Sequence, residues 1–160
     1  MSKVATKARD NVWYEARYNA AKKYHNDKLL SREGAAEEAG IDRTRLAKIE
    51  LDTIQPYPEE AVILADVYHA PELRYRYCRE CCPLGKNMPE IEEESLDRLT
   101  IKTLARMDRL QKDAKTLLDI VSDGSVSPIE REELQKVIQN MDELNEINQN
   151  LKVWLEKNGG

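Results

Sequence analysis

Four polar side chains lie close together in the segment RTRLAKIE, residues 43–50. At about 3.6 residues per turn, a helix over this segment places Leu46 and Ile49 on one face. The other face carries the polar group: Arg43, Thr44, Arg45 and Lys48. Guanidinium, ammonium and hydroxyl groups donate hydrogen bonds to phosphate oxygens and to the edges of bases. The segment therefore predicts a short helix with one apolar face and one face suited to nucleic acid.

A second group of reactive side chains lies in the segment YCRECCPLGK, which holds three cysteines: Cys78, Cys81 and Cys82. A structural zinc ion needs four ligands, commonly from two separated pairs, whereas here one cluster stands alone with His69 upstream. We therefore predict that the thiols pack as small apolar side chains and bind no metal. A redox or metal switch is the alternative, since Lys86 and Arg79 would lower the pKa of an exposed thiol.

The polar segment 43–50 follows a short helix and a tight turn. The hydroxyl of Ser31 can accept a hydrogen bond from a free backbone N–H and so begin a helix. Gly40 suits the left-handed conformation that ends many helices, and Asp42 can cap the next one. Two helices joined in this way form the layout of a helix-turn-helix, whose second helix presents its N-terminal residues to the major groove of DNA.

The rest of the first half also has helical patterns. A helix over residues 11–24 is predicted to carry its apolar stripe at Val12, Ala16, Ala20 and Tyr24, with Trp13 and Arg17 beside it. Pro58 suits the first turn of a further helix, EEAVILADVYHA, which is apolar on most sides and is expected to form the buried centre of the domain. Pro71 opens another short helix. No alternating β-branched run is long enough to predict a strand.

Residues 89–160 carry a different pattern, with apolar side chains at three- and four-residue spacing over two long stretches. The first stretch is predicted to begin in the acidic run near residue 90, and the second at Ser127 and Pro128. This pattern predicts a long antiparallel helical hairpin of the coiled-coil kind, with helices of about 27 residues. The apolar surface is wider than one seam, because Ile101, Ile138, Ile147 and Trp154 extend it. Either a second copy or the first domain must cover it. A second copy is the simpler answer, so we expect a homodimer through this hairpin.

Composition sets the broad class of the chain. Of its 160 residues, 41% are hydrophobic and 34% are charged, which is typical of a globular protein. Residues 1–86 hold 15 basic and 14 acidic side chains, and residues 87–160 hold 10 basic and 16 acidic, so the net charges are +1 and −6. The excess negative charge therefore lies in the second half, and a local basic cluster in the first half can still bind phosphate.

Several functional classes find no support in the sequence. No apolar run is long enough for a membrane span, and no signal peptide or export signal accompanies the cysteines, so we expect a cytoplasmic protein without a membrane partner. A glycine-rich phosphate loop, a nucleophile elbow and a zinc-protease motif are all missing. His25 and His69 are the two histidines, and neither belongs to a catalytic motif. We therefore predict no enzymatic activity and no cofactor.

Residues 11–78 resemble the Cro/cI-type helix-turn-helix family, also called the XRE family, of phage repressors and bacterial regulators. The resemblance is carried by the following features: Ala36, the turn Gly40–Ile41, Leu46, Ile49, Glu50, and Pro56 before the next helix. Gly34, Ala35 and Asp52 depart from the family pattern. More narrowly, the segment is similar to regulators found in Firmicutes and their mobile elements. The resemblance implies a five-helix domain that binds double-stranded DNA.

Roles for individual residues follow from this resemblance. Arg43 and Thr44 begin the helix that reads bases in the family. The fork of Arg43 would bind guanine O6 and N7, and Thr44 would donate to a phosphate or touch a thymine methyl group. Lys48 would contact a base or the backbone. Arg45 and Arg32 would contact phosphates.

Two further interpretations concern the same helix. The polar residues could instead form a solvated face that is salt-bridged to Glu37 and Glu38. Glu50 is predicted to be structural and to pair with an arginine of the first helix, such as Arg17.

Together these patterns predict an all-α chain with two domains. Residues 1–88 would form a five-helix Cro/cI-like helix-turn-helix domain, and residues 89–160 a helical hairpin that dimerises. The predicted function is a sequence-specific DNA-binding transcriptional regulator that acts as a dimer, most simply as a repressor. The alternative is a protein-interaction or scaffold protein of a phage or mobile element whose helix-turn-helix does not read DNA.

Overall fold

The computed structural model describes residues 10–122 and 124–159, and within them the chain is all-α with no strand. The all-α prediction is therefore confirmed for this part of the chain. The chain divides into two compact units, residues 1–88 and 89–160. The α-helices of the first unit are α1 (Val12–Lys23), α2 (Arg32–Ala39), α3 (Arg43–Glu50), α4 (Pro58–Val67) and α5 (Glu72–Cys81). Those of the second unit are α6 (Leu96–Ile120) and α7 (Pro128–Asn158).

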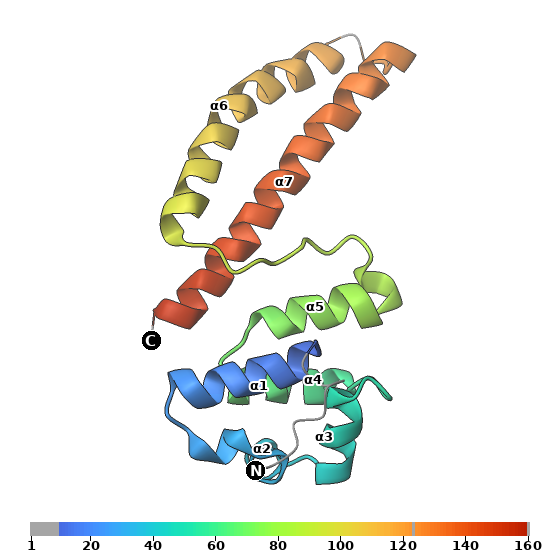
Figure 1. Ribbon diagram of the computed structural model, residues 1–160. Coiled ribbons are helices and arrows are strands. Elements are labelled where there is room, and N and C mark those ends of the chain that lie inside the picture. Colours follow the sequence, from blue (N-terminus) through green and yellow to red (C-terminus); the bar gives the residue numbers. More distant parts are fainter. Residues whose placement is uncertain (1–9, 123, 160) are drawn as a thin grey trace. The chain divides into compact units, whose positions relative to one another are not determined.

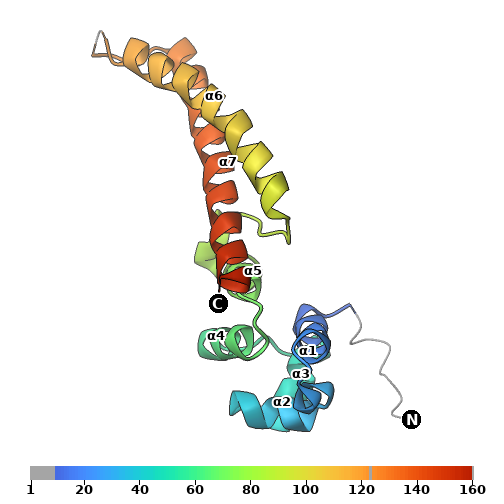
Figure 2. The ribbon, with the colours of Figure 1, turned by 90° about the vertical axis from the view of Figure 1, so that its left-hand side faces the viewer.

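Helices α1, α2, α3, α4 and α5 of the first unit lie together (Figure 2). All five contribute side chains to one hydrophobic core. A short 3₁₀ helix, Asp27–Leu30, connects α1 to α2, and a second, Pro83–Gly85, follows α5. The largest buried apolar side chains of this core are Trp13, Leu29, Leu46, Ile49, Leu64, Tyr68 and Leu73. The helices are short, so their stability comes mainly from this shared packing.

The buried face of α1 differs from the predicted stripe. Trp13 and Arg17 lie at its centre, whereas Val12 is only partly buried and Tyr24 is 40% exposed. Arg17 is buried because Glu50 neutralises its charge and the backbone carbonyl of Leu29 accepts a further hydrogen bond.

The position of α4 also corrects a prediction. This helix was expected to be buried on most sides, and Ala61, Leu64 and Ala65 are indeed buried. Val62 and Ile63, however, are 45% and 40% exposed. Helix α4 therefore covers the core with one face only.

The second unit is a hairpin in which α6 and α7 lie side by side in opposite directions (Figure 1). The helices have 25 and 31 residues, close to the predicted length. Ser127 and Glu130 form a capping box at the start of α7, with Pro128 in its first turn. The start of α6 lies later than predicted, because Ser95 caps it and accepts a hydrogen bond from the backbone N–H of Arg98.

The acidic run before α6 is extended rather than helical and is tied to its surroundings by polar contacts. The backbone N–H of Glu92 donates to Asn150 on α7, and the Asn150 amide donates to the carbonyl oxygen of Glu90. Glu94 pairs with Arg98 and Lys102 of α6. Among the described residues, no helix combines the length and the apolar character needed to cross a membrane.

Candidate nucleic-acid interface

Helices α2 and α3 are joined by a turn whose geometry follows from its capping residues. Ser31 accepts a hydrogen bond from the Gly34 N–H, and Asp42 accepts one from the Arg45 N–H. Gly40 ends α2 with φ of 63°, a left-handed conformation in which a side chain would be strained. The N–H of Ile41 reaches back to the carbonyl of Ala36 at 3.0 Å. The three predicted capping residues are therefore confirmed.

Helix α3 presents one buried and one exposed face. Leu46 and Ile49 are 0% and 1% exposed, so they anchor the helix in the core. Arg43, Thr44 and Lys48 are exposed, and among the described residues their side chains form no hydrogen bond or ion pair. The predicted pairing of this face with acidic residues of α2 is not found for these three. Their donor groups therefore point into solvent from a helix that is firmly held on its opposite side.

Arg45 lies differently, because it is bound to α4. Its guanidinium group donates from two nitrogens to the carboxylate of Glu60, one of them at 2.8 Å, and lies over the ring of Tyr57 at 4.0 Å from the ring centre. The hydrogen bond from Arg45 is the main reason why the pKa of Glu60 is lowered. A phosphate contact by Arg45 would have to compete with this two-point pair, so we assign Arg45 to the link between α3 and α4.

Glu50, at the end of α3, is fully buried and binds two arginines. Arg17 of α1 donates to both carboxylate oxygens, at 2.6 and 3.1 Å, which confirms the predicted pair. Arg32 of α2 donates its Nε to the same carboxylate at 2.6 Å, and its side chain is 29% exposed. This second pair is not predictable from the sequence pattern, because the two residues are 18 positions apart and lie on different helices. Glu50 therefore joins α1, α2 and α3, and Arg32 is partly committed to that network.

Tyr68, the residue directly after α4, lies close to the network of Glu50 and its arginines. Its side chain is 2% exposed, and its hydroxyl has no hydrogen-bond partner among the described residues. Burial raises the pKa of this phenol, and the negative charge of Glu50 adds to the effect. Tyr68 therefore stays neutral and serves as a large core side chain.

The three cysteines lie near the end of the first unit, in the last turn of α5 and directly after it. All three are free and half-buried, so the prediction of buried packing thiols holds only in part. The Cys81 thiol donates to the Gln55 side chain at 3.2 Å. Burial raises the pKa of the Cys81 thiol, and the carboxylates of Glu80 and Asp52 raise it further. The lowering by Arg79 and Lys86 was predicted for an exposed thiol, whereas the pKa of the half-buried Cys81 thiol is shifted in the opposite direction.

Neither a metal-binding cluster among the described residues nor a match to a known protein indicates the function. Within residues 10–122 and 124–159, no group of three or more His, Cys, Asp or Glu side chains is placed to hold a metal ion. The chain matches no family of known proteins, and comparison with curated proteins and with solved structures gives no match either.

Proposed function

We propose that the protein is a sequence-specific regulator that binds double-stranded DNA through a helix-turn-helix formed by α2 and α3. The observation that carries this proposal is the exposed, unpaired group Arg43, Thr44 and Lys48 on a helix whose other face is buried. Because the buried face fixes the backbone of α3, binding has to order only the exposed side chains and not the helix itself, which favours directed contacts to bases. Repression, by occupying a promoter site, is the simplest mode of action.

Each exposed residue has a role that its position supports. Arg43 is the first residue of α3, where a helix entering the major groove brings side chains to base edges. Its free guanidinium fork fits the O6 and N7 atoms of guanine. Thr44 suits a phosphate or a thymine methyl group, and Lys48 suits a phosphate one turn further along. Arg32 has only its Nε bound to Glu50, so its outer nitrogens are a further phosphate contact in this proposal.

Charge supports the assignment of DNA binding to the first unit. Residues 87–160 have six more acidic than basic side chains, and repulsion from phosphate disfavours DNA contact by the hairpin.

The alternative function, a protein-interaction or scaffold protein, is favoured by one observation. Large apolar side chains, such as Ile101 and Leu118 on α6, are 69% exposed and suit contact with another protein.

Selection of bound sites from random double-stranded DNA, followed by gel-shift measurements, tests the proposed function. The intact protein should enrich one sequence. Arg43→Ala should weaken binding to that sequence by about 1–3 kcal/mol and relax the preference at one base pair. Lys86→Ala removes one exposed positive charge outside α2 and α3 and is the matched control.

Two outcomes would count against DNA reading. One is the absence of any enriched sequence, which would favour the scaffold alternative. The other is an Arg43→Ala protein with the affinity and preference of the Lys86→Ala control.

A further inference from the structure

Helix α6 carries apolar side chains on two sides. One side faces α7 and includes Leu99 and Ile120, which are 1% and 3% exposed. The other side, called here the outer α6 stripe, consists of Ile101, Leu104, Met107 and Leu118 of α6, together with Val121 directly after its end. Each of these five side chains is between 56% and 69% exposed. Contact with α7 therefore leaves a large apolar surface of the hairpin uncovered.

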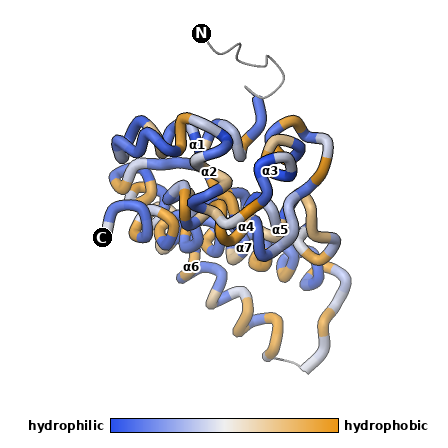
Figure 3. Tube along the Cα trace, turned by 90° about the horizontal axis from the view of Figure 1, so that it is seen from below, coloured by the Kyte–Doolittle hydropathy of each residue, from blue (hydrophilic) through white to orange (hydrophobic). Residues whose placement is uncertain are grey.

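The spacing of these residues shows that the outer α6 stripe is a second seam. Leu99, Arg106, Asp113 and Ile120 follow one another at intervals of seven, and all four are at least half-buried beside α7. Leu104 and Leu118 are two such intervals apart on another side of the helix, with the polar Gln111 at the position between them. Apolar residues recur along the whole of α6 (Figure 3). A helix with two apolar seams is typical of a bundle in which it contacts two neighbouring helices.

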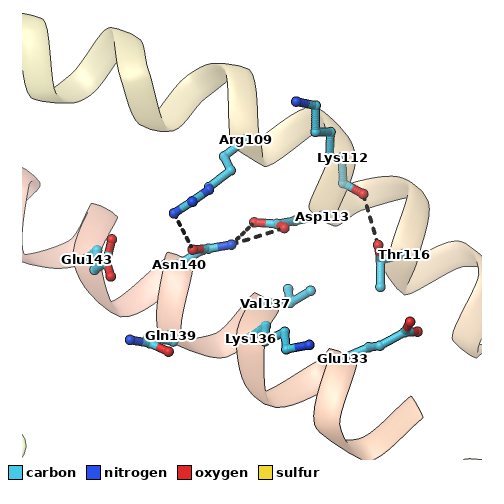
Figure 4. Close-up of a pocket in the computed structure, with 10 residues that line it drawn as sticks. All are labelled: Arg109, Lys112, Asp113, Thr116, Glu133, Lys136, Val137, Gln139, Asn140 and Glu143. Atoms are coloured by element: carbon cyan, nitrogen blue, oxygen red, sulfur yellow. Dashed lines mark hydrogen bonds between the residues drawn. The ribbon is translucent and has the colours of Figure 1, made fainter. Parts of the chain in front are cut away.

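The opposite side of the hairpin is polar. A cavity of about 500 Å³ between α6 and α7 has charged and amide side chains around it (Figure 4). Within it the Asn140 amide donates to both carboxylate oxygens of Asp113, and Arg109 donates to Asn140. Lys112 and Lys136 also line this cavity, which suits contact with water. The hairpin is therefore amphipathic as a unit, and its apolar side is the side to be covered.

Charge indicates which helix suits the outer α6 stripe. Helix α6 has six basic and four acidic side chains, whereas α7 has four basic and seven acidic ones. Inside the hairpin this difference is used directly, because Arg106 of α6 pairs with Glu143 of α7 at 2.5 Å. A helix placed against the outer α6 stripe should therefore be acidic and carry exposed apolar residues of its own. Helix α7 meets both requirements, since Ile138 and Met141 are 50% and 44% exposed.

We propose that the apolar side of the hairpin is covered by the same side of a second copy. In the resulting four-helix bundle, α6 of each copy lies between the α7 helices of both copies, so basic and acidic helices alternate around the bundle. The polar cavities with Asp113 and Asn140 stay on the outside. This inference names the surface of the dimer that the sequence predicts for a DNA-binding regulator, but it rests on the hairpin alone and does not require DNA binding.

Light scattering after size-exclusion chromatography of the full chain tests this surface. At tens of micromolar we expect a mass about twice the 18.5 kDa of one chain. Leu104→Glu places a charge in the outer α6 stripe and should halve that mass. Its control, Ala105→Glu, changes the neighbouring exposed residue on the polar side of α6 and should leave the dimer intact.

A second pair of variants examines α7 in the same way. Ile138→Glu should also halve the mass, whereas Gln139→Glu, at the polar cavity, should not. Circular dichroism reports whether each variant keeps its helices. If the Leu104→Glu variant loses its helices, the mass of the Ile138→Glu variant is the test of this surface. A full chain that is monomeric, or a dimer that both apolar-side variants leave intact, overturns the proposal. Dimer formation without any selected DNA sequence would overturn the proposed function and leave this inference standing.

Discussion

Gly34 lies inside α2 at a point where the backbone of Lys28 passes close by. A Cβ atom at this position would lie 2.4 Å from the Lys28 carbonyl oxygen. Glycine normally weakens a helix by up to about 1 kcal/mol relative to alanine, so its presence looked unfavourable in the sequence. Here glycine is required, because the backbone of Lys28 leaves no room for a Cβ atom.

The Gly34→Ala variant should therefore be destabilised although alanine favours helices. We expect a loss of about 1–3 kcal/mol in the free energy of unfolding, the usual cost of forcing atoms into a packed site. Urea denaturation measures it. Glu37→Ala, at an exposed position of the same helix, should change stability by no more than about 0.5 kcal/mol. A Gly34→Ala protein more stable than wild type would refute the close-approach explanation.

Glu50 is the residue on which the buried charges of the first unit depend. Replacing it with glutamine leaves Arg17, with a side chain 4% exposed, without its neutralising partner. Loss of one member of a buried ion pair commonly costs about 3–5 kcal/mol, and we expect Glu50→Gln to fall in that range. Arg32→Ala should cost about 1 kcal/mol or less, because the Arg32 side chain is partly solvated. Chemical denaturation measures both losses. Equal losses for Glu50→Gln and Arg32→Ala would show that burial of the charged side chains does not determine the size of the loss.

At the scale of elements, the pair of Arg45 and Glu60 holds α3 against the start of α4. The hydrogen bond from Arg45 lowers the pKa of Glu60, so the carboxylate binds its proton less readily in the folded chain than in the unfolded one. The stabilisation by this pair is therefore complete above the ordinary glutamate pKa of about 4.3 and is lost as the pH falls through the lowered value.

The Glu60→Gln variant gives the corresponding measurement. At pH 7 wild type should be more stable than the variant, and the difference should shrink progressively in acid as Glu60 becomes protonated. Urea denaturation of both proteins from pH 7 to about pH 3 follows this change. A difference that stays constant with pH would show that the charge of Glu60 does not contribute.

At the scale of the whole molecule, the two units are expected to have separate roles, with DNA binding in the first unit and dimerisation in the second. Residues 1–88 hold their own hydrophobic core and the exposed face of α3, whereas residues 89–160 hold the outer α6 stripe. A protein limited to residues 1–88 should be folded and monomeric. Its affinity for the selected DNA should be much lower than that of the intact chain, because a dimer adds a second half-site at high effective concentration.

Gel shifts and light scattering on the intact chain and on residues 1–88 check this division. The fragment should also show a smaller dependence of affinity on salt, because fewer phosphates are contacted. Equal affinity and equal salt dependence for both proteins would show that the hairpin plays no part in DNA binding.

Local signals in the sequence were sufficient for the helices and their ends. Ser31, Gly40, Asp42 and Ser127 act on backbone groups within a few residues, so their roles could be predicted without the fold. Apolar spacing likewise predicted the all-α character of the described residues and the long helices of the hairpin. The exposed positions of Arg43, Thr44 and Lys48 also follow from helical periodicity alone, because Leu46 and Ile49 define the buried face.

Only the tertiary structure decided which charged side chains are available. Arg43 and Arg45 are two positions apart on one short helix, yet Arg45 is bound to Glu60, 15 positions away, and Arg43 is not. Arg17 is buried because Glu50, 33 positions away, folds against it. Such pairs depend on how separate helices pack, and a pattern within one helix carries no information about them. For the same reason the sequence predicted that the hairpin carries more apolar surface than one seam covers, whereas the fold showed which of these residues stay exposed on α6 and on α7.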